Sequence, residues 1–160
     1  MELFEKFGIE GRIFVRPDSP LKSFTGQTIS NAEFEKDFDY LGFFDFPRDL
    51  PIVVSSPKEV LREWRFVVAN KEVVTGSQYY EHGQRQQQSV TDSDALAFAQ
   101  LVARSEYQPE PVWILDVGEC PDKQYRVVEI GAFSYAGLYN CDLDAVADAV
   151  SREAASLYAG

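Results

Sequence analysis

Three carboxylates, Asp116, Glu119 and Glu129, stand inside an otherwise apolar stretch at residues 111–139, PVWILDVGECPDKQYRVVEIGAFSYAGLY. Turn residues at 121–123 divide the stretch, which predicts a hairpin with Asp116 and Glu129 side by side. A carboxylate in a buried strand is costly unless it is paired or holds a metal, and two carboxylates on neighbouring strands suit Mg²⁺. The alternative is an Asp and a Glu on the solvent face of a half-exposed hairpin.

Basic side chains form a second set of candidates. Arg16 and Lys22 lie in RPDSPLKSFTG, a loop whose backbone N–H groups and lysine could cradle a phosphate, although it lacks the P-loop spacing. Arg65 shares a strand face with Glu63, because side chains alternate along a strand, and its planar guanidinium suits phosphate oxygens. The alternatives are a solvated loop and an ordinary cross-strand ion pair. Together with the carboxylates, these cations suit a metal–nucleotide.

The strands that must position these residues follow from apolar alternation and turn signals. Besides the two hairpin strands, strands are predicted at residues 13–16, 51–55, 63–69 and 72–80. Residues 18–26 and the polar segment at 81–90 are predicted to be loops, the second of them mobile. Tyrosines 79, 80, 135 and 139 could line a pocket, but strand aromatics more often belong to the core.

Three helices are predicted from capping residues and helical periodicity. They span residues 30–42 after the Ser30/Glu33 capping box, a segment beginning at Thr91, and the C-terminal segment after Asp142. The sum is an α+β fold in which an antiparallel sheet of five or six strands is covered by helices. A single domain at residues 1–160 is expected from the length.

Bulk composition excludes several classes of protein. The chain has 160 residues, is 45% hydrophobic and 14% aromatic, and is therefore expected to be globular. A net charge of −11 argues against a nucleic-acid surface or an anionic membrane surface. No apolar run reaches membrane-spanning length, and the acidic N-terminus is no signal peptide. Two cysteines and one histidine make a Cys/His zinc site unexpected and favour a reduced, cytoplasmic protein.

Five segments, taken in order, resemble the ATP-binding half of ATP-grasp proteins from bacteria and phages. They are RPDSPLKSFTG, PIVVSS, EWRFVVANKEVVTGSQYY, VWILDVGE and YRVVEIGAFSYAGLY. The resemblance runs from about residue 13 to the last helix and implies an ATP-grasp-like fold that binds ATP. Lys22 then matches the lysine that reaches the nucleotide phosphates, with Arg16 beside it. Val53, Val54 and Ser55 match the hinge whose backbone reads the adenine edge.

The same resemblance implies roles for the charged strand residues. Glu63 would lie near the ribose or adenine, and Arg65 would face the phosphates or an acyl-phosphate. Asp116 would be the first metal ligand and Glu129 the carboxylate of the family's E-x-N element. Gly131 stands where that element has Asn, so one side-chain ligand of a second Mg²⁺ is missing.

The function implied is that of a Mg·ATP-dependent ligase that joins a carboxylate to an amine or thiol through an acyl-phosphate. The resemblance implies that most of the N-terminal substrate domain usual in the family is missing from this chain. A partner chain or self-association is therefore expected to complete the protein, unless the chain is a fragment or a natural short form. Two alternatives stay open: a catalytically degenerate nucleotide-binding or protein-interaction module, and a plain acidic interaction domain.

Overall fold

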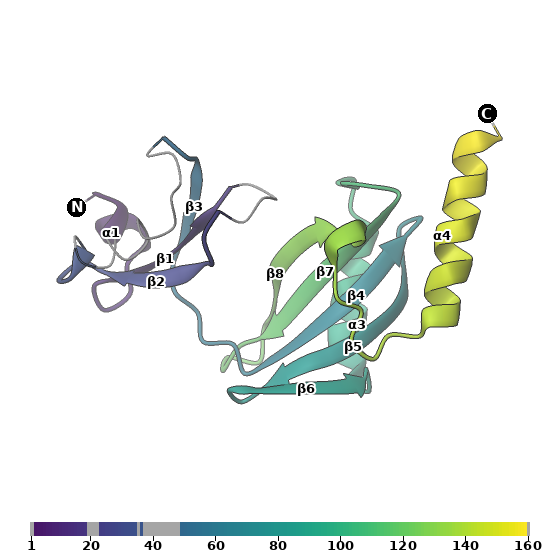
Figure 1. Cartoon of the computed structure of the whole chain (residues 1–160). Coiled ribbons are helices and arrows are strands. Elements are labelled where there is room, and N and C mark those ends of the chain that lie inside the picture. Colours follow the sequence, from purple (N-terminus) through teal and green to yellow (C-terminus); the bar gives the residue numbers. More distant parts are fainter. Residues whose placement is uncertain (1, 19–22, 35, 37–48, 160) are drawn as a thin grey trace. The chain divides into compact units, whose positions relative to one another are not determined.

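The computed structural model describes residues 2–18, 23–34, 36 and 49–159 (Figure 1). The chain divides into two compact units, Met1–Lys58 and Glu59–Gly160, called here the N-terminal and C-terminal units. The predicted α+β class is confirmed, but the strands form two antiparallel sheets where one sheet was expected. The predicted helix at 30–42 lies largely outside the described residues, as does Lys22. No helix in the described ranges is long and apolar enough to cross a membrane.

The N-terminal unit contains a three-stranded sheet with the order β2-β1-β3. The elements described in this unit are α1 (Glu2–Phe7), β1 (Arg12–Pro17), β2 (Gln27–Ser30) and β3 (Ile52–Ser55). Of the described residues, a buried cluster forms from apolar side chains of β1, of β2 and of the loop before β2: Ile13, Val15, Phe24 and Ile29. Strand β2 escaped prediction because its sequence, QTIS, has a single apolar residue and no alternation to detect.

The C-terminal unit is built on a five-stranded sheet with the order β6-β5-β4-β7-β8. Its strands are β4 (Arg62–Ala69), β5 (Glu72–Glu81), β6 (Gln84–Ser89), β7 (Val112–Glu119) and β8 (Tyr125–Ala132). Its helices are α3 (Ser93–Ala103), the 3-10 turn η1 (Phe133–Tyr135) and α4 (Leu143–Tyr158). Figure 1 shows α3 and η1 on opposite sides of this sheet.

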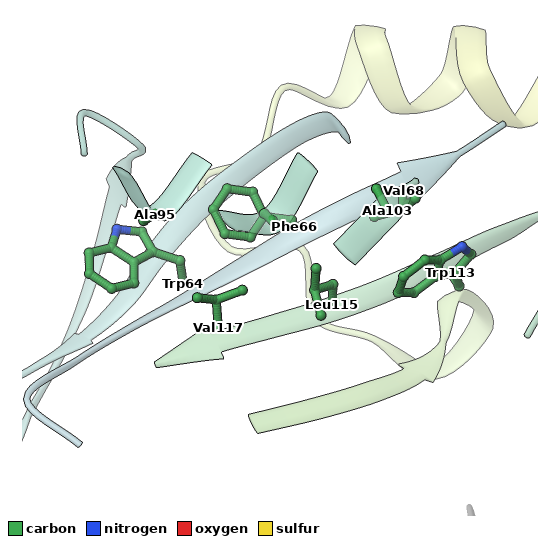
Figure 2. Close-up of a cluster of buried hydrophobic side chains, with 9 residues drawn as sticks. Trp64, Phe66, Val68, Ala95, Ala103, Trp113, Leu115 and Val117 are labelled. Atoms are coloured by element: carbon green, nitrogen blue, oxygen red, sulfur yellow. The ribbon is translucent and has the colours of Figure 1, made fainter. Parts of the chain in front are cut away.

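The two faces of the five-stranded sheet differ in chemistry. Figure 2 shows the large side chains of β4 and β7 gathered on the α3 side, packed on the helix's alanines. The cluster comprises Trp64, Phe66, Val68, Ala95, Ala99, Ala103, Trp113, Leu115 and Val117. On the opposite face, α4 covers one end through Val146 and Ala149, against Val67 and Ile114. Because side chains alternate, residues 65 and 116 continue that second face, which we call the α4 face.

The segment at 81–90 corrects a prediction, because it is a strand and turn in place of a mobile loop. His82 and Gly83 have φ of 45° and 84°, and they join β5 to β6 as a two-residue hairpin loop. Two left-handed residues are what the tight hairpin turn requires. The sequence QRQQQS lacks apolar alternation because β6 is an edge strand with mostly exposed side chains. The His-Gly pair was the signal that could have revealed the hairpin.

Most of the predicted helix and turn signals are confirmed. Asp142 is the N-cap of α4, and Asn70 and Lys71 form the turn between β4 and β5 with φ of 50° and 64°. The N-cap of α3 is Asp92 and not Thr91, because the Asp92 carboxylate accepts hydrogen bonds from two N–H groups of the first turn. This carboxylate also pairs with Arg62, which fastens the start of α3 to the sheet.

Candidate functional site

The candidate site centres on an ion pair between two adjacent strands. Arg65 of β4 lies directly opposite Asp116 of β7. Its Nε is 2.8 Å from Asp116 Oδ1 and its Nη2 is 2.7 Å from Oδ2, which is a bidentate contact. The Asp116 side chain is 3% exposed and the Arg65 side chain 13%. A buried charge pair of this kind gains little stability over apolar packing, so its presence on the α4 face points to a function.

Glu129 extends the row of charges to the third strand. It lies opposite Asp116 in the register between β7 and β8, which confirms that the hairpin brings the two carboxylates together. Burial raises the pKa of Asp116, and the charge of Glu129 acts in the same direction, whereas Arg65 opposes both. Glu119, the third carboxylate of the hairpin, instead pairs with Arg62, whose Nε is 2.5 Å from Glu119 Oε2.

Tyr79 joins a second carboxylate to the row. Its hydroxyl donates a hydrogen bond to Glu63 Oε2 and lies 3.4 Å from Asp116 Oδ2. The register of β4 and β5 shifts between Glu63 and Trp64, and Tyr79 is the extra residue of that bulge. A bulge re-aims side chains in this way without any mark in the strand pattern, so the sequence named Tyr79 only as one of four possible pocket tyrosines and did not predict its contact with Glu63.

The segment that leads from η1 to α4, residues 136–142, forms a strap over the α4 face. The Asn140 N–H donates to Ser77 Oγ at 3.2 Å, and the Asp142 N–H donates to Thr75 Oγ1 at 3.0 Å. Two hydroxyls of β5 therefore hold the strap against the sheet.

The strap also touches the ion pair itself. Arg65 Nη1 donates to the Gly137 carbonyl at 3.0 Å, and the Tyr139 ring stacks on Tyr79 with centroids 4.8 Å apart. The guanidinium carbon lies 5.1 Å from the Tyr139 centroid and 5.6 Å from that of Tyr79. Arg65 is thus held by a carboxylate, a carbonyl and two aromatic rings, a set that suits a permanent cation. Tyr135, by contrast, is 94% exposed.

The cluster is defined as Glu63, Arg65, Tyr79, Asp116 and Glu129. Burial is the largest cause of the pKa shifts of Glu63, Tyr79 and Asp116. It raises the pKa of Glu63 and of Tyr79, so the Tyr79 hydroxyl stays protonated and donates. The hydrogen bonds that Arg65 donates to Asp116 raise the pKa of Arg65, which therefore stays charged.

The carboxylates of the cluster fit a cation whose other ligands are phosphate and water oxygens. No group of three or more His, Cys, Asp or Glu in the described ranges could hold a metal by itself. Asp116 and Glu129 supply two carboxylates, and Mg²⁺ bound with a nucleotide needs only one or two. A Cβ at Gly131 would lie 3.7 Å from Glu129 Oε1 and within 4 Å of no other described atom outside its chain neighbours. Position 131 therefore has room for a larger side chain.

The remaining predicted residues belong to the N-terminal unit. Arg16 pairs with Val53 in the register between β1 and β3, and Val54 pairs with Val15. Ser55 is the last residue of β3 and lies opposite Phe14. Lys22 lies outside the described residues. Of the predicted site residues, the structure brings four together in one unit: Glu63, Arg65, Asp116 and Glu129.

Comparison with solved structures shows the same fold in known ligases. The ATP-grasp ligase PsnB, complexed with precursor peptide PsnA2 and AMPPNP, matches with a TM-score of 0.61 at 15% identity, over 95% of this chain and 48% of that chain. The D-alanine-D-alanine ligase from Coxiella burnetii matches with a TM-score of 0.55 at 14% identity, over 98% and 49%. The D-cycloserine synthetase DcsG matches with a TM-score of 0.52 at 14% identity, over 81% and 50%.

These matches establish the fold, and the chain spans about half the length of the structures that it matches. Residues 3–149 also match a family model for an ATP-grasp domain. This model represents family 2 of one clade of ATP-grasp domains. Because that match covers most of the chain, the protein is an ATP-grasp domain and belongs to family 2 of that clade. No curated protein matches the chain in sequence.

Proposed function

We propose that this chain is the ATP-binding half of a ligase that uses Mg·ATP to join a carboxylate to an amine or a thiol. The observation that supports this best is the row of Arg65, Asp116 and Glu129 on three adjacent strands of an ATP-grasp domain. The carboxylate oxygen of the substrate attacks the γ-phosphorus, and ADP leaves. The amine or thiol then attacks the acyl carbon, the bond from that carbon to the phosphate oxygen breaks, and the nucleophile gives up its proton as inorganic phosphate leaves.

The residues of this chain would act by position and charge. Asp116 and Glu129 would hold Mg²⁺, which supplies charge neutralisation at the phosphates when bound. Arg65 would stabilise negative charge on the transferring phosphoryl group or on the acyl-phosphate, where a buried guanidinium is most effective. Tyr79 would keep Glu63 in place beside the ribose or adenine.

We also assign nucleotide contacts to residues of the N-terminal unit. Arg16 and Lys22 would contact phosphate oxygens, and the backbone of Val53, Val54 and Ser55 would read the adenine edge. We expect a further domain, a partner chain or a second copy to complete the substrate site, since the chain spans about half of the ligases that it resembles. We place the protein in the cytoplasm, where ATP is abundant, and where two buried free cysteines stay reduced.

Calorimetric titration of ATP, with and without Mg²⁺, tests this proposal. Asp116→Asn and Lys22→Ala are each expected to weaken Mg²⁺-dependent ATP binding about tenfold or more. The first removes a charged metal ligand, and the second removes a cation that would contact the phosphates. Asp122→Asn is the matched control, since Asp122 is an exposed carboxylate at the turn of the same hairpin. Binding that is insensitive to Asp116 and Lys22 would contradict the assigned site.

A degenerate nucleotide-binding or protein-interaction module is the second candidate, and Gly131 favours it. Gly131→Asn restores the amide of E-x-N in a position with room for it. In a ligase, this variant is expected to bind Mg·ATP several-fold more tightly than the original chain. If neither chain binds ATP under any condition, the module becomes the better description.

A further inference from the structure

We propose that Asp116 is shared between Arg65 and the divalent cation, so that cation binding takes the carboxylate from Arg65 and frees the guanidinium for an anionic ligand. The inference rests on the proposed function and concerns the order in which the same site is filled. Arg65 would act as a placeholder for the cation. Cation binding and anion binding would then strengthen each other.

The geometry shows that the two demands on Asp116 conflict. Arg65 occupies both oxygens of the carboxylate, at 2.8 and 2.7 Å, and the Tyr79 hydroxyl approaches Oδ2 at 3.4 Å. With 2% of the residue exposed, Asp116 has little room for a further ligand beside these three groups. A cation bound between Asp116 and Glu129 would also lie next to the guanidinium, and two positive charges on one carboxylate repel each other.

The second contact set of Arg65 explains why the freed guanidinium stays in the site. Nη1 donates to the Gly137 carbonyl at 3.0 Å, and the rings of Tyr79 and Tyr139 lie about the guanidinium at 5.6 and 5.1 Å. None of these contacts depends on Asp116. When the carboxylate turns to a cation, Nε and Nη2 remain held on the α4 face with their N–H groups unpaired, and such a fork binds a phosphate oxygen pair well.

The proposal also explains why Arg65 pairs with Asp116 when no ligand is bound. Asp116 is buried in a strand, and a buried carboxylate without a partner is strongly unfavourable. Arg65 supplies that partner until a cation arrives. By thermodynamic linkage, an anion that binds Arg65 must then raise the affinity for the cation by the same factor by which the cation raises the affinity for the anion.

Binding of Mn²⁺ to the full chain without nucleotide, followed by electron paramagnetic resonance, tests the proposal. Arg65→Lys keeps the charge but cannot hold both oxygens, and Arg65→Gln removes the charge. Both variants are expected to bind Mn²⁺ at least threefold more tightly than the original chain. In an Asp116→Asn background, Arg65→Lys is expected to have no effect.

Arg126 provides the matched control. It forms a comparable fork on Asp122, with Nη1 3.0 Å from Oδ1 and Nη2 2.6 Å from Oδ2, but on the exposed turn of the hairpin. Arg126→Lys and Arg126→Gln are expected to leave Mn²⁺ affinity unchanged. If they raise it as much as the Arg65 variants do, general electrostatics explains the gain and the proposal is wrong.

A second titration measures the linkage with ADP as the anion. ADP is expected to bind the original chain at least tenfold more tightly with saturating Mn²⁺ than without it, and this coupling is expected to fall in Arg65→Gln. Arg65→Lys decides the first test if Arg65→Gln fails to fold, which a thermal melt reveals.

Two results would overturn the placeholder. One is an Mn²⁺ affinity that the Arg65 variants leave unchanged or lower. The other is an absence of Mn²⁺ binding in the Arg65 variants as well as in the original chain. If Mg²⁺-dependent, Asp116-sensitive ATP binding persists beside either result, only the placeholder fails and the proposed function stands.

Discussion

At the scale of single residues, Tyr79 is the link between the two carboxylates of β4 and β7. Its hydroxyl has one hydrogen, which goes to Glu63, and its ring supports Arg65 and Tyr139. The hydroxyl and the ring can therefore be separated by substitution.

Tyr79→Phe is expected to lower the free energy of unfolding by about 1–3 kcal/mol, because the half-buried Glu63 carboxylate loses its donor. Urea denaturation measures the change. Tyr139→Phe keeps the stacked ring at a residue that is 40% exposed, and is expected to change stability by less than about 0.5 kcal/mol. Equal effects from both variants would mean that the Tyr79 hydroxyl has no special role.

Glu63 gives the cluster a pH dependence whose sign follows from its environment. Burial raises the pKa of Glu63 above the ordinary value of 4.5, although the Tyr79 hydrogen bond lowers it in part. The folded protein thus holds this proton more tightly than the unfolded chain does. The resulting stability is complete below pH 4.5 and is lost as the pH rises through the higher pKa of the folded state.

Glu63→Gln keeps an acceptor for Tyr79 and removes the titration. The difference in the free energy of unfolding between the variant and the original chain is expected to grow in favour of the variant from pH 4 to pH 7, by on the order of 1 kcal/mol. Urea denaturation at the two pH values checks the sign. A gain that is the same at both values would show that the Glu63 proton is not linked to folding.

At the scale of elements, the strap decides how the α4 face is covered. Residues 136–142 connect η1 to α4, and two hydroxyls of β5 hold them down. The strap brings a backbone carbonyl and the Tyr139 ring to Arg65. Movement of the strap would therefore change the contacts of the arginine.

Removal of the two hydroxyls, in the variant Thr75→Val with Ser77→Ala, is expected to loosen the strap. Amide hydrogen exchange at Asn140 and Asp142 should become at least fivefold faster, because each N–H loses its acceptor. Exchange in α3, on the other face of the sheet, should stay as it was. Unchanged protection at Asn140 and Asp142 would show that other contacts hold the strap.

At the scale of the whole molecule, the C-terminal unit has the parts of an independent domain. Its sheet has a core on each face, one beneath α3 and one beneath α4. Among the described residues of the N-terminal unit, Ile13, Val15, Phe24 and Ile29 form a buried apolar cluster.

The fragment comprising residues 59–160 is expected to fold alone, because both of its cores lie within it. It should unfold in one cooperative transition and show dispersed amide resonances, with the Arg65–Asp116 pair intact. A fragment with the spectrum of an unfolded chain would mean that the N-terminal unit is needed for its stability.

Several features of this protein could be predicted from the sequence because they depend on local chemistry. The turn at 121–123 placed Asp116 opposite Glu129, and Asp142 marked the start of α4. The order of five segments predicted the ATP-grasp family, which the family match confirms. The prediction of a loop at residues 81–90 was wrong because a polar edge strand such as β6 has no apolar alternation. The predicted N-cap of α3 was wrong by one residue.

The sequence by itself therefore determined the α+β class and the carboxylate hairpin, since alternation, turns and caps act between residues that are near in the chain. The family followed from the resemblance of five segments to known proteins. Only the tertiary structure decided that Arg65 pairs with Asp116, 51 positions away in the chain. It also decided that a bulge brings the Tyr79 hydroxyl to Glu63 and that the strap contacts the guanidinium of Arg65. These contacts depend on the register between strands, and the packing of the whole sheet sets that register.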